Sequence, residues 1–190
     1  MNILIIGPQG AGKGTQAARV SAEYAARHIA TGDLFRAAIA NGTELGKRVE
    51  PLLAQGTLVP DETTVALIRE ELDRVPGGFI LDGFPRNLAQ AEALDAMLTE
   101  IERPLDIILL LELDDDDARQ RMSKRAEVEG RADDTPEVIE RRLATYREQT
   151  EPVVDHYLAT GKLVKVHAER TIDEVWAEIA EVLETVEARA

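Results

Sequence analysis

The sequence predicts an α/β fold in which a doubly wound parallel sheet carries helices on both faces. Two observations lead to this prediction. Short apolar runs recur between longer segments with helical periodicity, so strands and helices alternate along the chain. The apolar runs are nearly continuous rather than alternating, as expected for parallel strands that are buried on both faces.

The individual elements follow from local patterns. Strands are expected at four apolar runs, residues 2–6, 78–81, 106–113 and 163–166. Helices are expected near residues 14–26, 33–41, 44–55, 61–74, 88–101, 115–126 and 136–160. Pro136 follows Thr135 at a helix start, where the missing N–H of proline is harmless. Thr171 forms a capping-box pattern with Glu174 ahead of a final helix, whose apolar face contains Ile172, Val175, Trp176, Ile179, Val182, Leu183 and Val186.

The composition limits the class of protein. The 190 residues suit one compact domain, which at this length buries roughly 70% of its unfolded surface without disulfides or metal. Because the chain has no cysteine, thiolate metal sites, thiol nucleophiles and disulfide frameworks are excluded. The formal net charge of -14 argues against nucleic acid and anionic membranes as partners. The opening apolar run is too short for a signal peptide or membrane span, so a cytoplasmic location is expected.

A glycine-rich loop follows the first expected strand. It reads Gly7-Pro8-Gln9-Gly10-Ala11-Gly12-Lys13-Gly14-Thr15 and leads into a helix, the context of a phosphate-binding loop. Its glycines let backbone N–H groups turn toward a phosphate, the helix N-terminus adds partial positive charge, and Lys13 reaches the terminal phosphates. A strict match has Ser or Thr directly after the lysine, whereas here Gly14 takes that position and Thr15 follows. The loop predicts nucleotide binding, which many activities share.

Elimination favours direct phosphoryl transfer as the chemistry. Ser21 and Ser123 are the only serines, both in expected helices, and no Gly-x-Ser-x-Gly occurs. His28, His156 and His167 lack metal-ligand spacing, so structural roles are expected for all three. The acidic run 114–117 is interpreted as a helix N-terminus rather than a metal site. Phosphoryl transfer needs positioning and charge neutralisation, and no covalent intermediate.

Further motifs carry a resemblance to a known family. After Asp82, which ends a buried strand, come Gly83-Phe84-Pro85-Arg86 and then Gln90. Together with the phosphate loop, Thr31-Gly32-Asp33-Leu34-Phe35-Arg36, Leu58-Val59-Pro60-Asp61, Gly130-Arg131-Ala132-Asp133-Asp134 and Arg142, they make the sequence resemble the nucleoside monophosphate kinases, most closely the adenylate kinase family. The resemblance covers essentially the whole chain.

The resemblance implies a single P-loop kinase domain over residues 1–190. Its core is a five-stranded parallel sheet with two small mobile inserts, a monophosphate-binding insert at about 30–59 and a lid at about 124–135. Only five residues separate Arg125 from Arg131, so the chain resembles the short-lid type. Long-lid members insert a subdomain that sometimes holds zinc through cysteines, and no structural zinc is expected here. We also expect a cis Phe84–Pro85 peptide, a usual way to fix a tight reversal.

The resemblance also assigns roles to residues. The implied catalytic residues are Lys13, Arg86, Arg125, Arg131 and Arg142. ATP would contact Gly10, Ala11, Gly12, Lys13, Gly14, Thr15, Arg125 and Arg170, the last on position alone. AMP would contact Thr31, Arg36, Thr57, Leu58, Val59, Gly83, Phe84, Pro85, Arg86, Gln90, Arg131 and Arg142. Asp82, with Thr15 and Asp33 directly or through water, would organise Mg²⁺, the expected cofactor with ATP.

Several alternatives remain open at this level. The first hypothesis is reversible transfer from ATP to AMP giving two ADP, in adenine nucleotide homeostasis, by a monomer. A kinase acting on UMP or CMP differs in its base contacts, for which Gln90 and Thr31 favour adenine. A nucleotide-dependent switch or binding module would use the same loop, although no Asn-Lys-x-Asp guanine-binding pattern occurs. The alternative for Gln90 is an exposed helix residue, and Arg119, Arg141 and Arg147 are interpreted as solvated residues on helix faces.

Overall fold

One parallel sheet organises the molecule. The computed structural model describes residues 1–129 and 134–188. Within them the sheet contains the strands β1 (Asn2–Ile6), β2 (Arg27–Ala30), β3 (Phe79–Asp82), β4 (Ile107–Glu112) and β5 (Leu163–His167). Their order across the sheet is β2-β3-β1-β4-β5, and every neighbouring pair is parallel. The predicted α/β doubly wound fold is confirmed.

The helices connect the strands and cover both faces of the sheet. They are α1 (Lys13–Tyr24), α2 (Thr31–Ala40), α3 (Glu44–Gln55), α4 (Asp61–Asp73), α5 (Leu88–Glu100), α6 (Asp115–Glu129), α7 (Pro136–Thr145), the π-helical turn η1 (Tyr146–Thr150), α8 (Glu151–Leu158) and α9 (Ile172–Glu187). The capping box of Thr171 and Glu174 is present at the start of α9. The acidic run also starts a helix as predicted, since the N–H of Asp117 donates to the Asp114 carboxylate.

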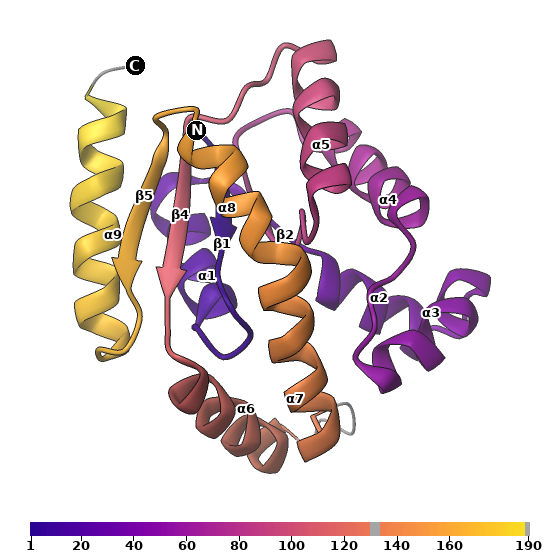
Figure 1. The fold of residues 1–190 in the computed structure, drawn as a ribbon. Helices are drawn as coiled ribbons and strands as arrows, with labels where there is room; N and C mark the ends of the chain where they lie inside the picture. The colour runs from indigo at the N-terminus through magenta and orange to yellow at the C-terminus, as the bar shows by residue number, and fades with distance from the viewer. Residues whose placement is uncertain (130–133, 189–190) are drawn as a thin grey trace.

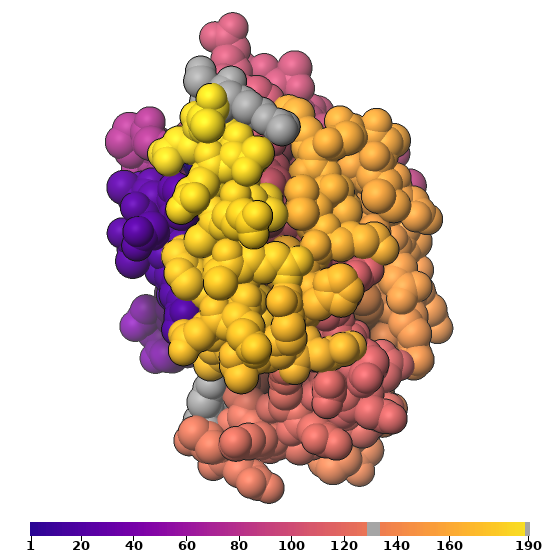
Figure 2. Space-filling model, turned by 90° about the vertical axis from the view of Figure 1, so that its left-hand side faces the viewer, coloured from indigo at the N-terminus to yellow at the C-terminus, as the bar shows by residue number. Residues whose placement is uncertain are grey.

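Strand β1 shows how each face acquires its own core. Ile3 and Ile5 point to one face, where α1 and α9 pack, whereas Leu4 and Ile6 point to the other, where α4, α5 and α8 pack. All four side chains are buried, which explains the continuous apolar run in the sequence. In Figure 1 the sheet lies between these two layers, and Figure 2 shows α9, in yellow, covering one side of the molecule.

Helices α2 and α3 form a small unit beside the sheet. Phe35, Val49 and Val59 are buried in a cluster of their own, separate from both sheet cores, with Leu45 and Leu52 packed against it. In Figure 1 the two helices project away from the strands on the side opposite α9. Their packing therefore comes mainly from contacts with each other.

Two local features differ from the sequence prediction. Strand β2 was not identified, because Arg27-His28-Ile29-Ala30 is short, polar in part and lies at the sheet edge with Arg27 exposed. The helix expected over 136–160 is interrupted by the π-helical turn, so it becomes α7, η1 and α8. Pro152 stands at the start of α8, and since proline cannot donate to the preceding turn, the helix widens there.

The carboxyl ends of the strands define the edge where function is expected. In an open parallel sheet ligands bind at this edge. The phosphate loop follows β1, Gly83 follows β3, and α6 follows β4; in Figure 1 α6 and α7 lie beyond the arrowheads of β4 and β5. The Phe84–Pro85 peptide in the loop after β3 is cis, as predicted. Among the described helices, none has the length and apolar character needed to span a membrane.

Candidate active site

A cavity of about 820 Å³ opens at the carboxyl edge of the sheet. It is lined by the phosphate loop, the ends of β2 and β3, helices α2 and α3 with the segment after them, and helices α6 and α7. Segments that are far apart in the sequence therefore meet around one space. The predicted site residues that line it are Gly10, Gly12, Lys13, Gly14, Thr15, Thr31, Asp33, Arg36, Thr57, Leu58, Val59, Asp82, Gly83, Pro85, Arg86, Gln90, Arg125 and Arg142.

The phosphate loop wraps the start of α1 and holds Lys13 within itself. The Lys13 ammonium donates to the carbonyl oxygens of Gly7 and Pro8, each at 2.8 Å. Gly10 has φ +88°, and a Cβ there would lie 2.8 Å from the carbonyl oxygen of Ala118 on α6. Only glycine combines that conformation with so close an approach. The loop is thus shaped to present its amides and Lys13 to an anion.

Burial has changed the titration of Lys13. Desolvation lowers its pKa to about 8, with Arg86 and Arg125 acting in the same direction and Asp82 opposing them. A cation that has lost part of its hydration, and that donates its hydrogen bonds to neutral carbonyl oxygens, is stabilised strongly by an incoming anion. This is the electrostatic condition of a phosphate site.

Asp82 supplies negative charge to the same cavity. Burial works to raise the pKa of Asp82, but the His28 ring and the charges of Lys13 and Arg86 outweigh it and hold that pKa below its usual value. Its Oδ2 lies 3.4 Å from Nε2 of His28, which also lines the cavity. Asp82 is therefore an ionised carboxylate at the end of β3.

Arg86 reaches the cavity from the loop after β3. Its Nε donates to the carbonyl oxygen of Gly83 at 2.7 Å, and Thr31 donates to the same oxygen at 2.9 Å. Burial lowers the pKa of Arg86, and the charges of Arg142 and Arg36 add to this effect while Asp82 opposes it. Several cations thus converge on one region of the cavity.

Arg125 and Arg142 come from α6 and α7 and share one carboxylate. Arg125 donates through Nε and Nη2 to Oδ2 of Asp134, at 2.9 and 2.7 Å, and Arg142 pairs with Oδ1 of the same side chain. The Asp134 side chain is fully buried. Both arginines line the cavity and Asp134 does not, so the carboxylate supports them from behind.

Gln90 is buried in the wall of the cavity, with only 2% of its surface exposed. The backbone N–H of Arg86 donates to its Oε1 at 2.8 Å, and its Nε2 donates to Oδ1 of Asp61 at 2.7 Å. The alternative, that Gln90 is an exposed helix residue, is therefore wrong.

Other predicted residues lie at the rim of the large cavity or line a second cavity. Arg36 donates to Asp33 at 2.5 Å, three residues away, and both are substantially exposed at the cavity rim. Ala11 and Arg170 line a second cavity, of about 320 Å³, beside Gly10, Gly12 and Thr15. Arg170 is also paired with Glu178 of α9.

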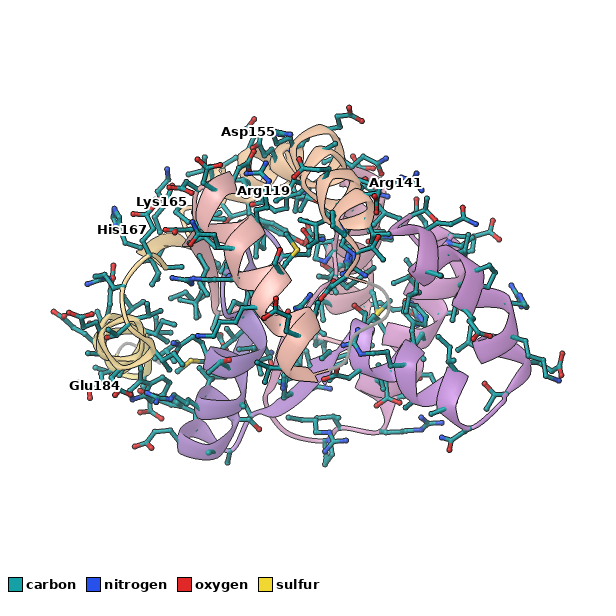
Figure 3. All side chains as sticks on the ribbon, turned by 90° about the horizontal axis from the view of Figure 1, so that it is seen from below. Arg119, Arg141, Asp155, Lys165, His167 and Glu184 are labelled. Atoms are coloured by element: carbon teal, nitrogen blue, oxygen red, sulfur yellow. The ribbon has the colours of Figure 1, made fainter. Side chains whose placement is uncertain are left out.

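Some predicted residues do not line either cavity. Phe84 is buried in the sheet core, so its backbone turn rather than its ring bears on the site. Arg131 lies outside the described residues. Arg119 pairs with Asp116 and Glu140, and Arg147 with Asp115, consistent with solvated helix faces. Arg141, labelled in Figure 3, is also exposed as expected. It donates in addition to the carbonyl oxygen of Gln55 at 2.8 Å, which joins α7 to the end of α3.

Sequence reasoning missed several residues that the fold brings to the site. Arg121 lines both cavities, and Lys124 and His28 line the larger one. His28 lies in a strand that the apolar pattern did not reveal, and nothing in the sequence pairs it with Asp82. Asp61 and Asp134 stand inside quoted motifs, which was the available signal for both.

Known proteins are similar to this chain along most of its length. A family model described as adenylate kinase matches residues 5–162. The adenylate kinase of Synechococcus sp. (strain RCC307) is 50% identical over 181 residues, covering 95% of this chain and 97% of that protein. An adenylate kinase of Thermus thermophilus is 49% identical over 178 residues, covering 93% and 94%, and that of Caulobacter vibrioides (strain NA1000) is 46% identical over 190 residues, covering 99% and 100%. The chain therefore belongs to the adenylate kinase family and is a nucleoside monophosphate kinase.

Proposed function

We propose that this chain transfers the terminal phosphoryl group of ATP to AMP and forms two ADP in a reversible reaction. One observation carries the proposal. The phosphate loop with Lys13 and the second set of cations around Arg86 face the same cavity, so two phosphate-bearing molecules can meet there. A phosphate oxygen of AMP bonds to the γ-phosphorus of ATP as the bond from that phosphorus to the β–γ bridging oxygen breaks.

The donor side is formed by the phosphate loop. Residues 10–15 hold the ATP phosphates, with the loop amides and Lys13 as the donors. The second cavity, lined by Gly10, Thr15 and Arg170, continues from this loop and offers room for the rest of the donor nucleotide.

The acceptor side is formed by the segments that follow β2 and β3. Arg36 and Arg86 hold the AMP phosphate, because planar guanidinium groups match phosphate oxygens bidentately. Thr31, residues 57–59 and the loop 83–85 form the wall around the nucleoside, and Gln90 contacts the adenine. Residues 30–59 form the monophosphate-binding insert of a single domain that spans residues 1–190, and residues 124–135 form the lid.

Arg125, Arg131 and Arg142 act on the transferring group. Charge develops on the equatorial oxygens of that group, and Arg125 and Arg142, which Asp134 holds in position, can stabilise it without reorganisation. Water must be excluded at the same time, so that AMP rather than water receives the phosphoryl group.

The residues present fit a magnesium ion that enters with ATP. Asp82 is ionised, and Thr15 and Asp33 line the same cavity, whereas no group of three or more His, Cys, Asp or Glu that could hold a metal occurs among the described residues. Magnesium at nucleotide sites uses one or two carboxylates together with phosphates and water, so such a sparse donor set suffices. The ion neutralises phosphate charge when it is bound. We further propose a cytoplasmic monomer without structural zinc.

Acceptor selection tests the proposal. Initial rates are measured with ATP and each of AMP, UMP and CMP, and we expect AMP to be strongly preferred. Equal use of UMP or CMP would make the chain a pyrimidine or broad monophosphate kinase.

The variant Gln90→Ala sharpens this test. A buried polar group that loses its hydrogen-bonding partner is destabilised. We therefore expect kcat/KM for AMP to fall by roughly ten- to a hundredfold, while the Kd of ATP stays unchanged. An unchanged AMP efficiency would remove Gln90 from the acceptor site and leave the kinase proposal intact.

A further inference from the structure

The amide of Gln90 is held in one orientation by two partners of opposite character. Oε1 accepts from the backbone N–H of Arg86 at 2.8 Å, and Nε2 donates to Oδ1 of Asp61 at 2.7 Å. A backbone N–H can only donate and a carboxylate can only accept. Rotation of the amide by half a turn would therefore place its NH₂ against an N–H and its oxygen against a carboxylate. Both contacts would become repulsive.

Asp61 is itself fixed in place behind the cavity wall. Nδ2 of Asn87 donates to the same Oδ1 of Asp61 at 2.9 Å, and Oδ1 of Asn87 caps α5 by accepting from the N–H of Gln90 at 2.9 Å. Gln90 lines the large cavity, while Asp61 and Asn87 are not among its lining residues. The three side chains join the start of α4 to the start of α5. Asp61 can therefore influence a bound base only through Gln90.

The fixed orientation decides which purine the amide can bind. Two hydrogen bonds leave Gln90 one N–H and one oxygen lone pair for a ligand. A 6-aminopurine presents an amino donor beside a ring acceptor, which match that lone pair and that N–H. A 6-oxopurine presents a carbonyl acceptor beside a ring N–H, which would match only the rotated amide. The site therefore rejects the 6-oxo base by leaving polar groups unpaired, and such rejection is more effective than a change in shape.

We propose that Asp61 is a specificity-determining positioning residue that locks the amide of Gln90 and so selects 6-amino over 6-oxo purine monophosphates. The inference rests on the proposed function, because it concerns the base of the phosphoryl acceptor. It assigns Asp61 a role in selectivity that is separate from binding of the acceptor phosphate by the arginines.

The test compares AMP with IMP, which differ at this edge of the base. The measured quantity is the ratio of kcat/KM for AMP to that for IMP, with ATP as donor. If turnover of IMP is below detection, the ratio of the inhibition constant of IMP to the KM for AMP replaces it. In Asp61→Ala only the Arg86 N–H still orients the amide, so this ratio should fall about tenfold. Loss of fold or of acceptor binding as such would lower both efficiencies together and leave the ratio unchanged.

Two further variants separate the hydrogen-bond acceptor at position 61 from the negative charge of Asp61. In Asp61→Asn, a single amide oxygen can still accept from both Gln90 and Asn87, since both bonds reach one oxygen in the structure, so the ratio should remain near that of the wild type. Glu62→Ala removes a neighbouring charge in the same first turn of α4 from an exposed position and should leave the ratio unchanged. If Asp61→Ala does not fold, Asp61→Leu keeps the branched shape without the acceptor and serves in its place.

The possible outcomes are distinct. An unchanged ratio in the Ala or Leu variant, or an Asn variant that behaves like Ala, overturns the role of Asp61. A wild type that uses AMP and IMP equally also overturns it, while the kinase activity stands. A wild type that does not phosphorylate AMP overturns the proposed function itself.

Discussion

Two pairs of cations face the same cavity and are held in different ways. Lys13 and Arg86, the strand-end pair, follow β1 and β3: Lys13 begins α1 after the phosphate loop, and Arg86 lies in the loop after β3. Main-chain carbonyl oxygens of residues 7, 8 and 83 accept their hydrogen bonds. Arg125 and Arg142 stand on α6 and α7, and the buried carboxylate of Asp134 holds both of them. The first pair is therefore positioned by the backbone, and the second by one side chain.

The difference affects both charge and robustness. Carbonyl oxygens are neutral, so these hydrogen bonds leave the charge of the strand-end cations available to a phosphate. Burial lowers the pKa of Lys13 even though the Asp82 carboxylate opposes the shift. A carboxylate neutralises part of the charge of the helix pair but fixes two guanidinium groups at once. We therefore expect the contribution of the strand-end pair to the transfer rate to be lost only when Lys13 or Arg86 itself is substituted. The contribution of the helix pair should also be lost when Asp134, which does not line the cavity, is substituted.

The largest expected effect comes from removal of a strand-end cation. Lys13→Ala or Arg86→Ala should lower the rate of phosphoryl transfer by about 10³ or more, because charge neutralisation carries most of this chemistry. The fold should persist, since neither side chain belongs to a sheet core. Turnover and circular dichroism are measured on the same preparations. A folded variant with most of its activity would exclude that residue from the site.

Removal of Asp134 should have the next largest effect. Asp134→Ala leaves two partly buried arginines without their shared partner, so the free energy of unfolding should fall by about 3 kcal/mol. Transfer should fall about ten- to a hundredfold in protein that is still folded at the assay temperature, because the arginines lose their position.

The matched control for Asp134 is Glu140→Ala on α7. It breaks the solvent-exposed pair with Arg119 and should leave the free energy of unfolding close to that of the wild type. If Asp134→Ala loses stability and keeps the full transfer rate, the carboxylate has a purely structural role.

The lowered pKa of Lys13 predicts a pH dependence of nucleotide binding. Below pH 8 Lys13 is already protonated and ATP affinity should be insensitive to this group. Above pH 8 ATP binding must take up a proton, so affinity should fall by about tenfold per pH unit. Isothermal titration calorimetry in buffers of different ionisation enthalpy measures this uptake. Lys13→Arg should not show it, because a guanidinium group does not titrate in this range.

The lowered pKa of Lys13 also determines the direction in which the free energy of unfolding changes with pH. The pKa of Lys13 is about 8 in the folded protein and 10.5 as its reference value, so the unfolded chain binds more protons between these two values. The free energy of unfolding of the nucleotide-free protein should therefore gain a contribution from this group as the pH rises through that window. Chemical denaturation of the wild type and Lys13→Arg across this range isolates that contribution from other titrating groups.

The smallest expected effect is that of a zinc-selective chelator. The chain has no cysteine, and the described residues contain no cluster that could hold a metal. The melting temperature should be unchanged by the chelator. A lower melting temperature would indicate a metal site that supports the fold.

The fold class followed from the sequence because the central strands are buried on both faces. Apolar runs such as Asn2–Ile6 can be recognised as strands from their own sequence, without knowledge of the neighbouring strands. Edge strand β2 could not, since its partly polar sequence is stabilised by pairing with β3 alone. The π-helical turn was missed because the effect of Pro152 depends on how the widened turn packs.

How far the site could be predicted differs between the two pairs of cations. Residues that share one loop, such as Lys13 with Gly10 or Arg86 with Gly83, were predictable from motif spacing. The partners that position other site residues were not, because Asp134 with Arg125 and Asp61 with Gln90 come from different elements. Hydrogen-bonding direction, which fixes the amide of Gln90, has no signature in the sequence.

Product stoichiometry tests the central claim, that both pairs of cations act on a phosphoryl group passing between two nucleotides. Purified protein is incubated with magnesium, ATP and AMP, and nucleotides and free phosphate are quantified by ion chromatography over time. We predict that two ADP form for each ATP consumed, that no ADP forms without AMP, and that free phosphate stays at background. Release of one phosphate per ATP, independent of AMP, would contradict the claim and identify a nucleotide-hydrolysing switch.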